Sequence, residues 1–117
     1  MLSIFGLKLS KMKFEKTFGD TLRKLREDKQ LTLREVASEL GIDTSMLGKI
    51  EKNSRKPTKN LIEKISMIYN VSSKVLTIAF LSDAVVYQVL DEEVAEEVLK
   101  VAEKKVKYLK TRNLLEK

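Results

Sequence analysis

Three polar side chains of one short segment could form hydrogen bonds with a ligand outside the protein. Leu47 and Ile50 are spaced i, i+3, which places both on one helix face and predicts that this face is buried. Thr44, Ser45 and Lys49 must then face outward on the same helix. Short hydroxyls can donate or accept a hydrogen bond at a base edge, and lysine can donate to O6 and N7 of guanine. The spacing therefore predicts a helix with one buried side and one side that can form hydrogen bonds.

A second short helix and a glycine turn precede this segment. Within residues 33–52, Val36 and Leu40 form an apolar stripe at i, i+4 spacing. Ala37 lies on the neighbouring face, where a small side chain lets another helix cross closely. Gly41 follows where the helix must stop and where a positive φ favours glycine. These offsets are typical of a helix-turn-helix, whose second helix enters the major groove of DNA.

Residues 17–76 resemble the Xre-type family of lambda repressor-like DNA-binding domains. The resemblance is carried by Leu22, Leu25, Arg26, the run LTLREVASELGI, residues 48–52 (GKIEK), residues 55–58 (RKPT) and the run LIEKISMIYNVSSKVL. It implies an all-α, five-helix domain in which Thr44, Ser45 and Lys49 occupy the base-contacting positions. It also places Thr32 and Arg34 where the second helix approaches the DNA backbone with its amino end, which attracts phosphate. Gly48 departs from the family, in which a polar residue is usual at this position.

A basic loop follows the predicted recognition helix and ends at the only proline, Pro57. Because of this position, we expect Asn53, Arg55, Lys56 and Lys59 to contact phosphate. The alternative is a solvated surface with no DNA contact, as is usual for charge runs. Asn53 departs from the family, in which glycine is common, but asparagine also tolerates the left-handed backbone conformation.

The remaining helices of this domain are predicted from caps and apolar spacing. The first helix should begin near Thr17 and end near residues 29–30, and Thr32 with Glu35 should form a capping box for the second. We expect Asp43 to cap the recognition helix, Thr58 to cap the next helix, and Asn70 to adopt a left-handed conformation at its end. The expected buried residues are Phe18, Leu22, Leu25, Leu61, Ile62, Ile65 and Ile68, with Met46 partly buried.

The last part of the chain, residues 77–117, is predicted to be a helical appendage. Residues 75–90 are apolar almost all round, yet they are too few and too polar to span a bilayer. A helix of this kind must be buried on every face, and one small domain has little surface left to cover it. Residues 91–93, all acidic, should open a last helix, where the macrodipole favours negative charge. Its apolar stripe, predicted as the dimer interface, comprises Val94, Val98, Val101, Ala102, Val106 and Leu109. The alternative is that the last helix folds back on the preceding helix of the same chain.

Residues 1–16 match nothing in the family pattern, and three interpretations stay open for them. They could be a basic arm that contacts DNA, an apolar segment packed on the core or a partner chain, or a disordered tail. They contain no long apolar region with a small-residue cleavage site, so we expect no secretory signal and a cytoplasmic protein.

Charge and composition favour DNA binding over catalysis. The net charge is +6; residues 1–60 hold 14 basic and 8 acidic residues, whereas residues 61–117 hold nine of each. The whole excess of positive charge thus lies in the half with the helix-turn-helix, as expected of a DNA-facing module. The chain has no cysteine and no histidine, which removes thiolate chemistry and the commonest general base and metal ligand. We expect no enzyme, no cofactor, no metal site and no membrane segment.

The expected function is that of a sequence-specific transcriptional regulator whose partners are double-stranded DNA and a second copy of the chain. Such a homodimeric repressor would bind a palindromic operator, with two recognition helices about 34 Å apart in successive major grooves. The alternative is an antitoxin, or partner-binding protein of a toxin pair, that uses the C-terminal helices for protein interaction.

Overall fold

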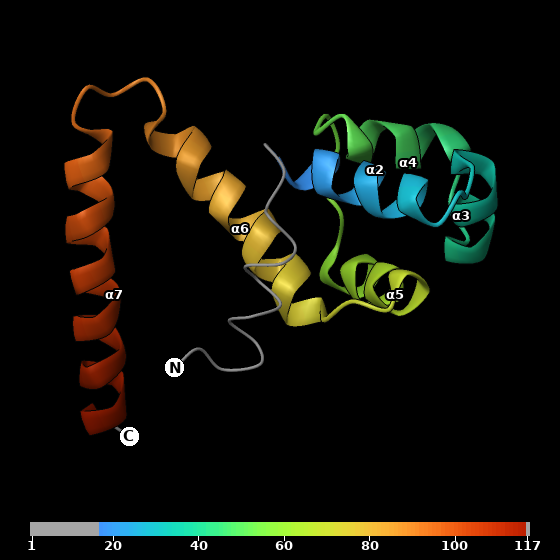
Figure 1. Ribbon diagram of the computed structural model, residues 1–117. Helices are drawn as coiled ribbons and strands as arrows, with labels where there is room; N and C mark the ends of the chain where they lie inside the picture. The colour runs from blue at the N-terminus through green and yellow to red at the C-terminus, as the bar shows by residue number, and fades with distance from the viewer. Residues whose placement is uncertain (1–16, 117) are drawn as a thin grey trace. The chain divides into compact units, whose positions relative to one another are not determined.

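The computed structural model describes residues 17–116, and the side chains of residues 17–113. Within this part of the chain all regular structure is helical (Figure 1). The helices are α2 (Phe18–Asp28), α3 (Leu33–Leu40), α4 (Thr44–Glu51), α5 (Lys59–Tyr69), α6 (Ser73–Val89) and α7 (Ala95–Glu116). The predicted all-α fold is confirmed. The three interpretations of residues 1–16 lie outside the described residues.

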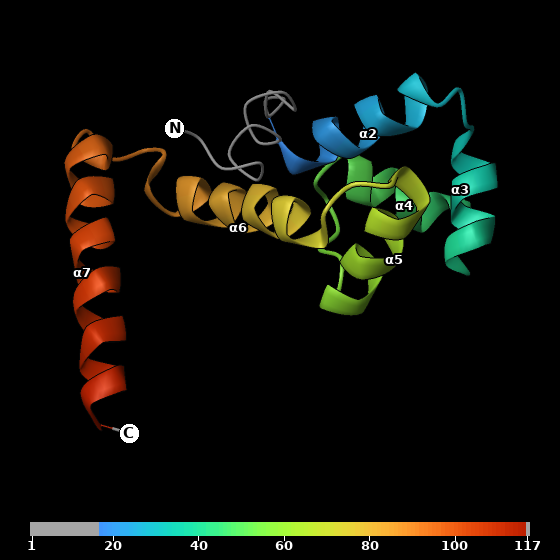
Figure 2. The same cartoon turned by 60° about the horizontal axis from the view of Figure 1, so that its bottom comes forward.

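The chain forms two compact units that meet within α6. The first unit ends at Asp83 and the second begins at Ala84. In two views α2, α3, α4 and α5 of the first unit form a cluster, and a short connection leads from α5 to α6 (Figures 1 and 2). The expected domain boundary between residues 76 and 77 falls inside α6, so the domain limits remain a prediction.

Three threonines cap the helices that they were predicted to cap. The side-chain oxygens of Thr17, Thr32 and Thr58 each accept a hydrogen bond from the backbone N–H three residues later, at 3.1 Å. The Glu35 carboxylate in turn accepts a hydrogen bond from the Thr32 N–H at 3.1 Å, which completes the capping box. Each cap satisfies an amide that the first helical turn leaves without a partner.

The recognition helix α4 begins differently from these three. Asp43 occupies the expected N-cap position with an extended backbone, but its side chain makes no capping hydrogen bond among the described residues. The predicted position is therefore correct and the predicted hydrogen bond is absent.

The helix ends also agree with the sequence. Gly41, after α3, has a φ of 72°, and Asn70, after α5, has a φ of 52°. Asn53, after α4, likewise adopts a left-handed conformation with a φ of 63°. Glycine and asparagine tolerate this region better than other residues, which explains why α3 and α5 stop where they do.

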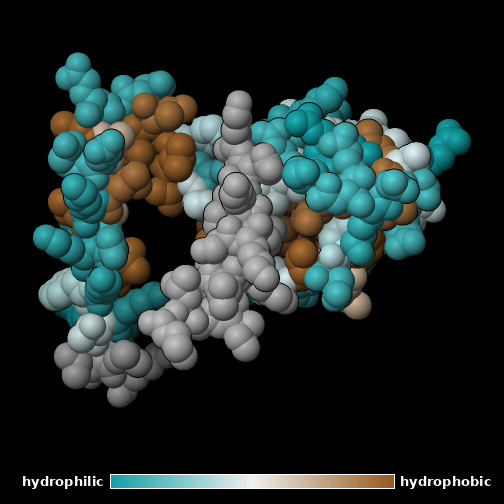
Figure 3. Space-filling model, in the orientation of Figure 1, coloured by the Kyte–Doolittle hydropathy of each residue, from teal (hydrophilic) through white to brown (hydrophobic). Residues whose placement is uncertain are grey.

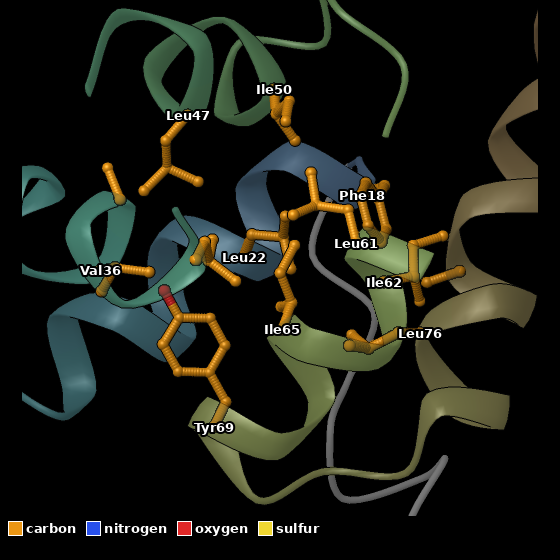
Figure 4. Packing of buried hydrophobic residues seen from close by; sticks show 13 residues of the cluster. Phe18, Leu22, Val36, Leu47, Ile50, Leu61, Ile62, Ile65, Tyr69 and Leu76 are labelled. Atoms are coloured by element: carbon orange, nitrogen blue, oxygen red, sulfur yellow. The ribbon is translucent and has the colours of Figure 1, made fainter. Parts of the chain in front are cut away.

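One hydrophobic core joins α2 to α6 (Figure 4). It contains the predicted residues Phe18, Leu22, Leu61, Ile62 and Ile65, and Met46 is partly buried against it as expected. Leu25 and Ile68 are only partly buried. Tyr69, whose burial was not predicted, inserts its ring into the cluster with 3% of its surface exposed.

The two halves of α6 differ in environment. Val75, Leu76 and Ala79 are buried, and the ring of Phe80 meets Phe18 edge-on at 5.3 Å, which packs α6 against the start of α2. Further along, Leu81, Val85, Val86 and Tyr87 are exposed. This exposure agrees with the expectation that one small domain cannot cover the whole helix, and burial of these side chains by a second copy stays a prediction.

The last helix begins later than predicted. Residues 91–93 lie in a turn, in which the Ala95 N–H donates to the Glu92 carbonyl at 3.2 Å, and α7 starts at Ala95. Glu96 and Glu97 supply the negative charge of its first turn instead. Acidic residues favour a helix start over several positions, so they did not determine the first residue.

The large apolar side chains of α7 are exposed as far as residue 113, and brown, hydrophobic surface is visible along α7 and the last turns of α6 (Figure 3). The large exposed side chains from Val94 onward are Val94, Val98, Leu99, Val101, Val106, Tyr108 and Leu109. None of the described helices is long and apolar enough to cross a membrane.

Candidate DNA interface

The recognition helix α4 presents its polar side chains as predicted. Leu47 and Ile50 are each 1% exposed and anchor the helix to the core. Thr44, Ser45 and Lys49 lie on the exposed side. The orientation of the helix is thus confirmed, whereas contact of these three side chains with bases stays a prediction.

Several cations around α4 are available to bind an anion. Thr32 and Arg34, at the start of α3, are exposed, and so are Arg55, Lys56 and Lys59. The ion pairs found among the described residues involve none of the cations named here, nor Lys49. Their phosphate contacts remain predictions, but no carboxylate in the described part of the chain forms an ion pair with these groups.

The basic loop is anchored at both of its ends. At one end, the Asn53 N–H donates to the Ile50 carbonyl at 3.1 Å and the Ser54 N–H donates to the Lys49 carbonyl at 2.9 Å. At the other end, Pro57 is buried and Thr58 caps α5. Arg55 and Lys56 are therefore displayed on a short connection between two fixed points.

Asn53 makes contacts that the sequence did not predict. Its Oδ1 accepts a hydrogen bond from the Gly19 N–H at 2.9 Å, and its Nδ2 donates to Oγ1 of Thr17 at 2.8 Å. The amide thereby joins the loop to the first turn of α2. A phosphate contact of Asn53 remains untested, but both polar atoms of its side chain already have a protein partner.

Gly19 allows α2 to approach the end of α4 closely. A Cβ at this position would lie 2.3 Å from the carbonyl oxygen of Glu51 and 2.8 Å from Oδ1 of Asn53. The first distance is too short for any side chain. A glycine in the first turn of a helix, where better helix formers are usual, is the signal that could have indicated this approach.

A buried ion pair makes a second contact between α2 and the end of α4. Nε of Arg26 donates to Oε2 of Glu51 at 2.9 Å, and Nη2 donates to Oε1 at 3.1 Å. The Arg26 side chain is 13% exposed and that of Glu51 is 5% exposed. Nη1 of Arg26 also donates to the Leu31 carbonyl. The hydrogen bond to Glu51 raises the pKa of Arg26, so the guanidinium stays charged, and the bidentate contact fixes the last turn of α4.

Three side chains accept hydrogen bonds from backbone amides of the first turn of α2. Besides Asn53 and Thr17, the third acceptor is Oδ2 of Asp83 in α6, to which the Phe18 N–H donates at 2.6 Å. This role of Asp83 was not predicted from the sequence. A single acidic residue within an apolar run is the signal that could have suggested a buried or capping partner.

The described residues offer no arrangement suited to metal-dependent chemistry. No group of three or more carboxylates within this part of the chain could hold a metal ion. The arrangement instead combines a helix that exposes hydrogen-bonding side chains with nearby cations that have no ion-pair partner among the described residues. These features suit a ligand that carries many negative charges and also offers hydrogen-bonding groups, as DNA does.

Comparison with known proteins places this domain in a family. Residues 22–76 match the family model described as "Helix-turn-helix". Among solved structures, the N-terminal DNA-binding domain of SinR from Bacillus subtilis is 31% identical, and the match covers 51% of this chain and 88% of that chain with a TM-score of 0.48. No curated protein matches the chain. On the residues matched by the family model, the chain belongs to the helix-turn-helix family of Xre, lambda repressor-like DNA-binding transcription regulators.

Proposed function

We propose that this regulator reads DNA with α4 in the major groove and acts as a dimeric repressor at a palindromic operator. The observation that carries the proposal is the exposed set of Thr44, Ser45 and Lys49 on a helix fixed by its buried side. Because Leu47 and Ile50 anchor that side, the three polar side chains have a defined direction relative to the rest of the domain. Lys49 is the best candidate for a guanine contact, since its ammonium can donate to O6 and N7.

Phosphate contacts would supply most of the affinity. Arg55 and Lys56 lie on the anchored loop beside the exposed side of α4, and Thr32, Arg34 and Lys59 complete the set. Each neutralised phosphate releases counterions, so affinity should fall with salt concentration.

A salt titration tests this electrostatic contribution. Replacing Arg55 and Lys56 together by alanine should reduce the slope of log K against log salt by about two, if each cation neutralises one phosphate. Replacing Lys100 and Lys104, two exposed lysines of α7, removes the same charge elsewhere and should leave the slope unchanged. Equal slopes in the wild type and the loop variant would show that the basic loop is only a solvated surface.

A second copy of the chain is the proposed partner of the C-terminal helices. The exposed stripe of Val94, Val98, Val101, Val106 and Leu109 has no cover within the described part of the chain, and partly buried Ala102 adjoins it. Burying one such side chain stabilises an association by about 1.5–3 kcal/mol, before the loss of motional freedom is counted. Repression would then follow from occupation of a promoter by the paired domains.

Sedimentation of the intact chain tests the pairing. We expect a dimer at micromolar concentration for the wild type and a monomer for Val98→Glu, which places a charge in the stripe. Lys100→Glu, on the opposite side of α7, is the matched control and should remain a dimer. A wild-type monomer would contradict the dimer proposal and leave DNA reading by α4 intact.

The same exposed stripe favours one alternative, that of an antitoxin or partner-binding protein of a toxin pair. Its C-terminal helices would then cover an apolar surface on another protein rather than on a second copy. Co-purification with the product of an adjacent gene, in a stoichiometric complex that Val98→Glu abolishes, would favour this alternative over the homodimer.

A further inference from the structure

We infer that Asn53 is a positioning residue, which fixes the basic loop on the first turn of α2 so that Arg55 and Lys56 are held ready for phosphate. The basic loop is defined here as residues 53–56. The inference rests on the proposed function and replaces the expectation that Asn53 itself binds phosphate.

The geometry of Asn53 carries the inference. The side-chain amide uses its acceptor on the Gly19 N–H at 2.9 Å and its donor on Oγ1 of Thr17 at 2.8 Å. Its backbone is left-handed, with a φ of 63°, and its own N–H donates to the Ile50 carbonyl at 3.1 Å. One residue therefore ends the recognition helix, starts the basic loop and binds both to α2.

The partner of Asn53 is itself firmly held. The first turn of α2 receives the Asp83 carboxylate at the Phe18 N–H, at 2.6 Å, and Phe18 packs edge-on against Phe80. Gly19 brings the α2 backbone against the Glu51 carbonyl, where a Cβ would clash. The hydrogen bonds between Asn53 and this turn therefore fix the loop to a part of α2 that is itself held in place by the core.

Fixing the loop matters for binding because ordering a flexible segment on DNA opposes association. Beyond Asn53, only the exposed Ser54, Arg55 and Lys56 precede the buried Pro57. Two of these three residues are cations, and the side chain of Asn53 is the link that ties their loop to another helix. Without this link, only the backbone hydrogen bonds at its first end and Pro57 with Thr58 at its second end would hold the loop, and more of its ordering would take place during binding.

A double-mutant cycle on the full chain tests the inference, with a fluorescein-labelled DNA duplex of arbitrary sequence as the probe. Asn53→Gly removes both side-chain hydrogen bonds but keeps the left-handed backbone accessible. Arg55→Ala removes one proposed phosphate contact and should weaken binding by about five- to tenfold at low salt. We expect Asn53→Gly to reproduce most of that loss. The affinity of the double variant should be within about twofold of that of the single variant that binds DNA less tightly, because the effects of coupled residues are not additive.

Two controls separate positioning from a general loss of structure. Asn70→Gly makes the same chemical change at another left-handed helix end, and should leave affinity unchanged. Thr17→Val removes the acceptor for Nδ2 of Asn53 together with the side-chain cap of α2 and should weaken DNA binding, whereas Thr17→Ser, which keeps both bonds, should bind like the wild type. All affinities are measured well below the melting temperature of each variant, as determined by circular dichroism.

The possible results distinguish the inference from the function on which it rests. Losses that multiply in the double variant, or an Asn53→Gly variant that binds like the wild type, would overturn the role of Asn53. Failure of the wild-type chain to bind any duplex would instead contradict the proposed function.

Discussion

The two compact units of this chain treat their apolar side chains in opposite ways. Among the described residues, every buried hydrophobic side chain lies between Phe18 and Ala79, whereas, apart from Met67, the large exposed ones lie from Ile78 onward. Among the same residues, the first unit buries most of its apolar side chains within itself, whereas α7 leaves its large apolar side chains exposed. An apolar stripe at helical spacing thus predicts a surface that favours burial, but it does not show whether the same chain or another molecule buries it.

The largest expected effect concerns the buried charge that holds α4 within the first unit. Arg26→Met leaves Glu51, whose side chain is 5% exposed, without its bidentate partner. The unpaired carboxylate should lower the free energy of unfolding by about 4 kcal/mol. Urea unfolding followed by circular dichroism measures this change. Arg23→Met, which breaks a solvent-exposed pair with Asp20, is the control and should cost less than about 1 kcal/mol.

The contrast between the units can be tested with two identical substitutions. Leu76 is completely buried, whereas Leu109 is 53% exposed. Leu76→Ala should therefore destabilise the chain by about 3 kcal/mol through loss of packing and a residual cavity. Leu109→Ala should have little effect on the unfolding of the monomer at low concentration, but should weaken association. Similar losses of monomer stability from both substitutions would contradict the contrast.

Tyr69 makes the stability of the first unit sensitive to alkaline pH. Burial, and secondarily the Glu51 carboxylate, raises the pKa of the Tyr69 phenol to about 12 from its ordinary value of 10. The unfolded chain therefore loses this proton at lower pH than the folded chain, and stability should fall as pH rises from about 10 to about 12. The rise in pKa, two units at about 1.4 kcal/mol each, corresponds to about 3 kcal/mol.

Tyr69→Phe is the matched variant for this pH dependence. It should abolish the Tyr69 contribution, so the difference in unfolding free energy between variant and wild type should grow through this pH range. At neutral pH the variant should be no less stable, because the phenol hydroxyl has no hydrogen-bond partner among the described residues. A difference that stays constant between neutral and alkaline pH would contradict the raised pKa.

The smallest expected effect concerns the exposed side of α4. Lys49→Ala should weaken binding to a selected sequence by about 1.5 kcal/mol, or about tenfold, and relax the preference at one base pair. The folding of the first unit should be unaffected, since Lys49 is exposed. An unchanged preference at every position would show that Lys49 does not read a base.

The fold of the first unit could be predicted because several local signals agreed there. Threonine caps, the left-handed Gly41 and Asn70, and the stripe of Leu47 and Ile50 all specify the same helices. The predicted start of α7 was wrong because a run of acidic residues favours the start of a helix without defining its first residue. The sequence did indicate that one small domain could not cover residues 75–90, but it could not show that burial within the first unit stops near Phe80.

The site could be predicted in its orientation but not in its supports. Spacing along one helix showed which side of α4 is exposed. The roles of Asn53, Gly19 and Asp83 depend on contacts between segments that are 34 or 65 residues apart, as in the bonds to Gly19 and Phe18. Such contacts leave no periodic signal in a single sequence. They become visible only when the helices are placed in space.

Selection of bound sequences from random duplex DNA by the intact chain tests the central claim most directly. If the first unit reads bases through α4 and the second unit pairs two chains, the selected sequences should form an inverted repeat. The centres of the two half-sites should then lie about one helical turn apart, or a multiple of it. Recovery of no enriched sequence would contradict base reading by α4, and a single half-site without symmetry would contradict pairing through the C-terminal helices.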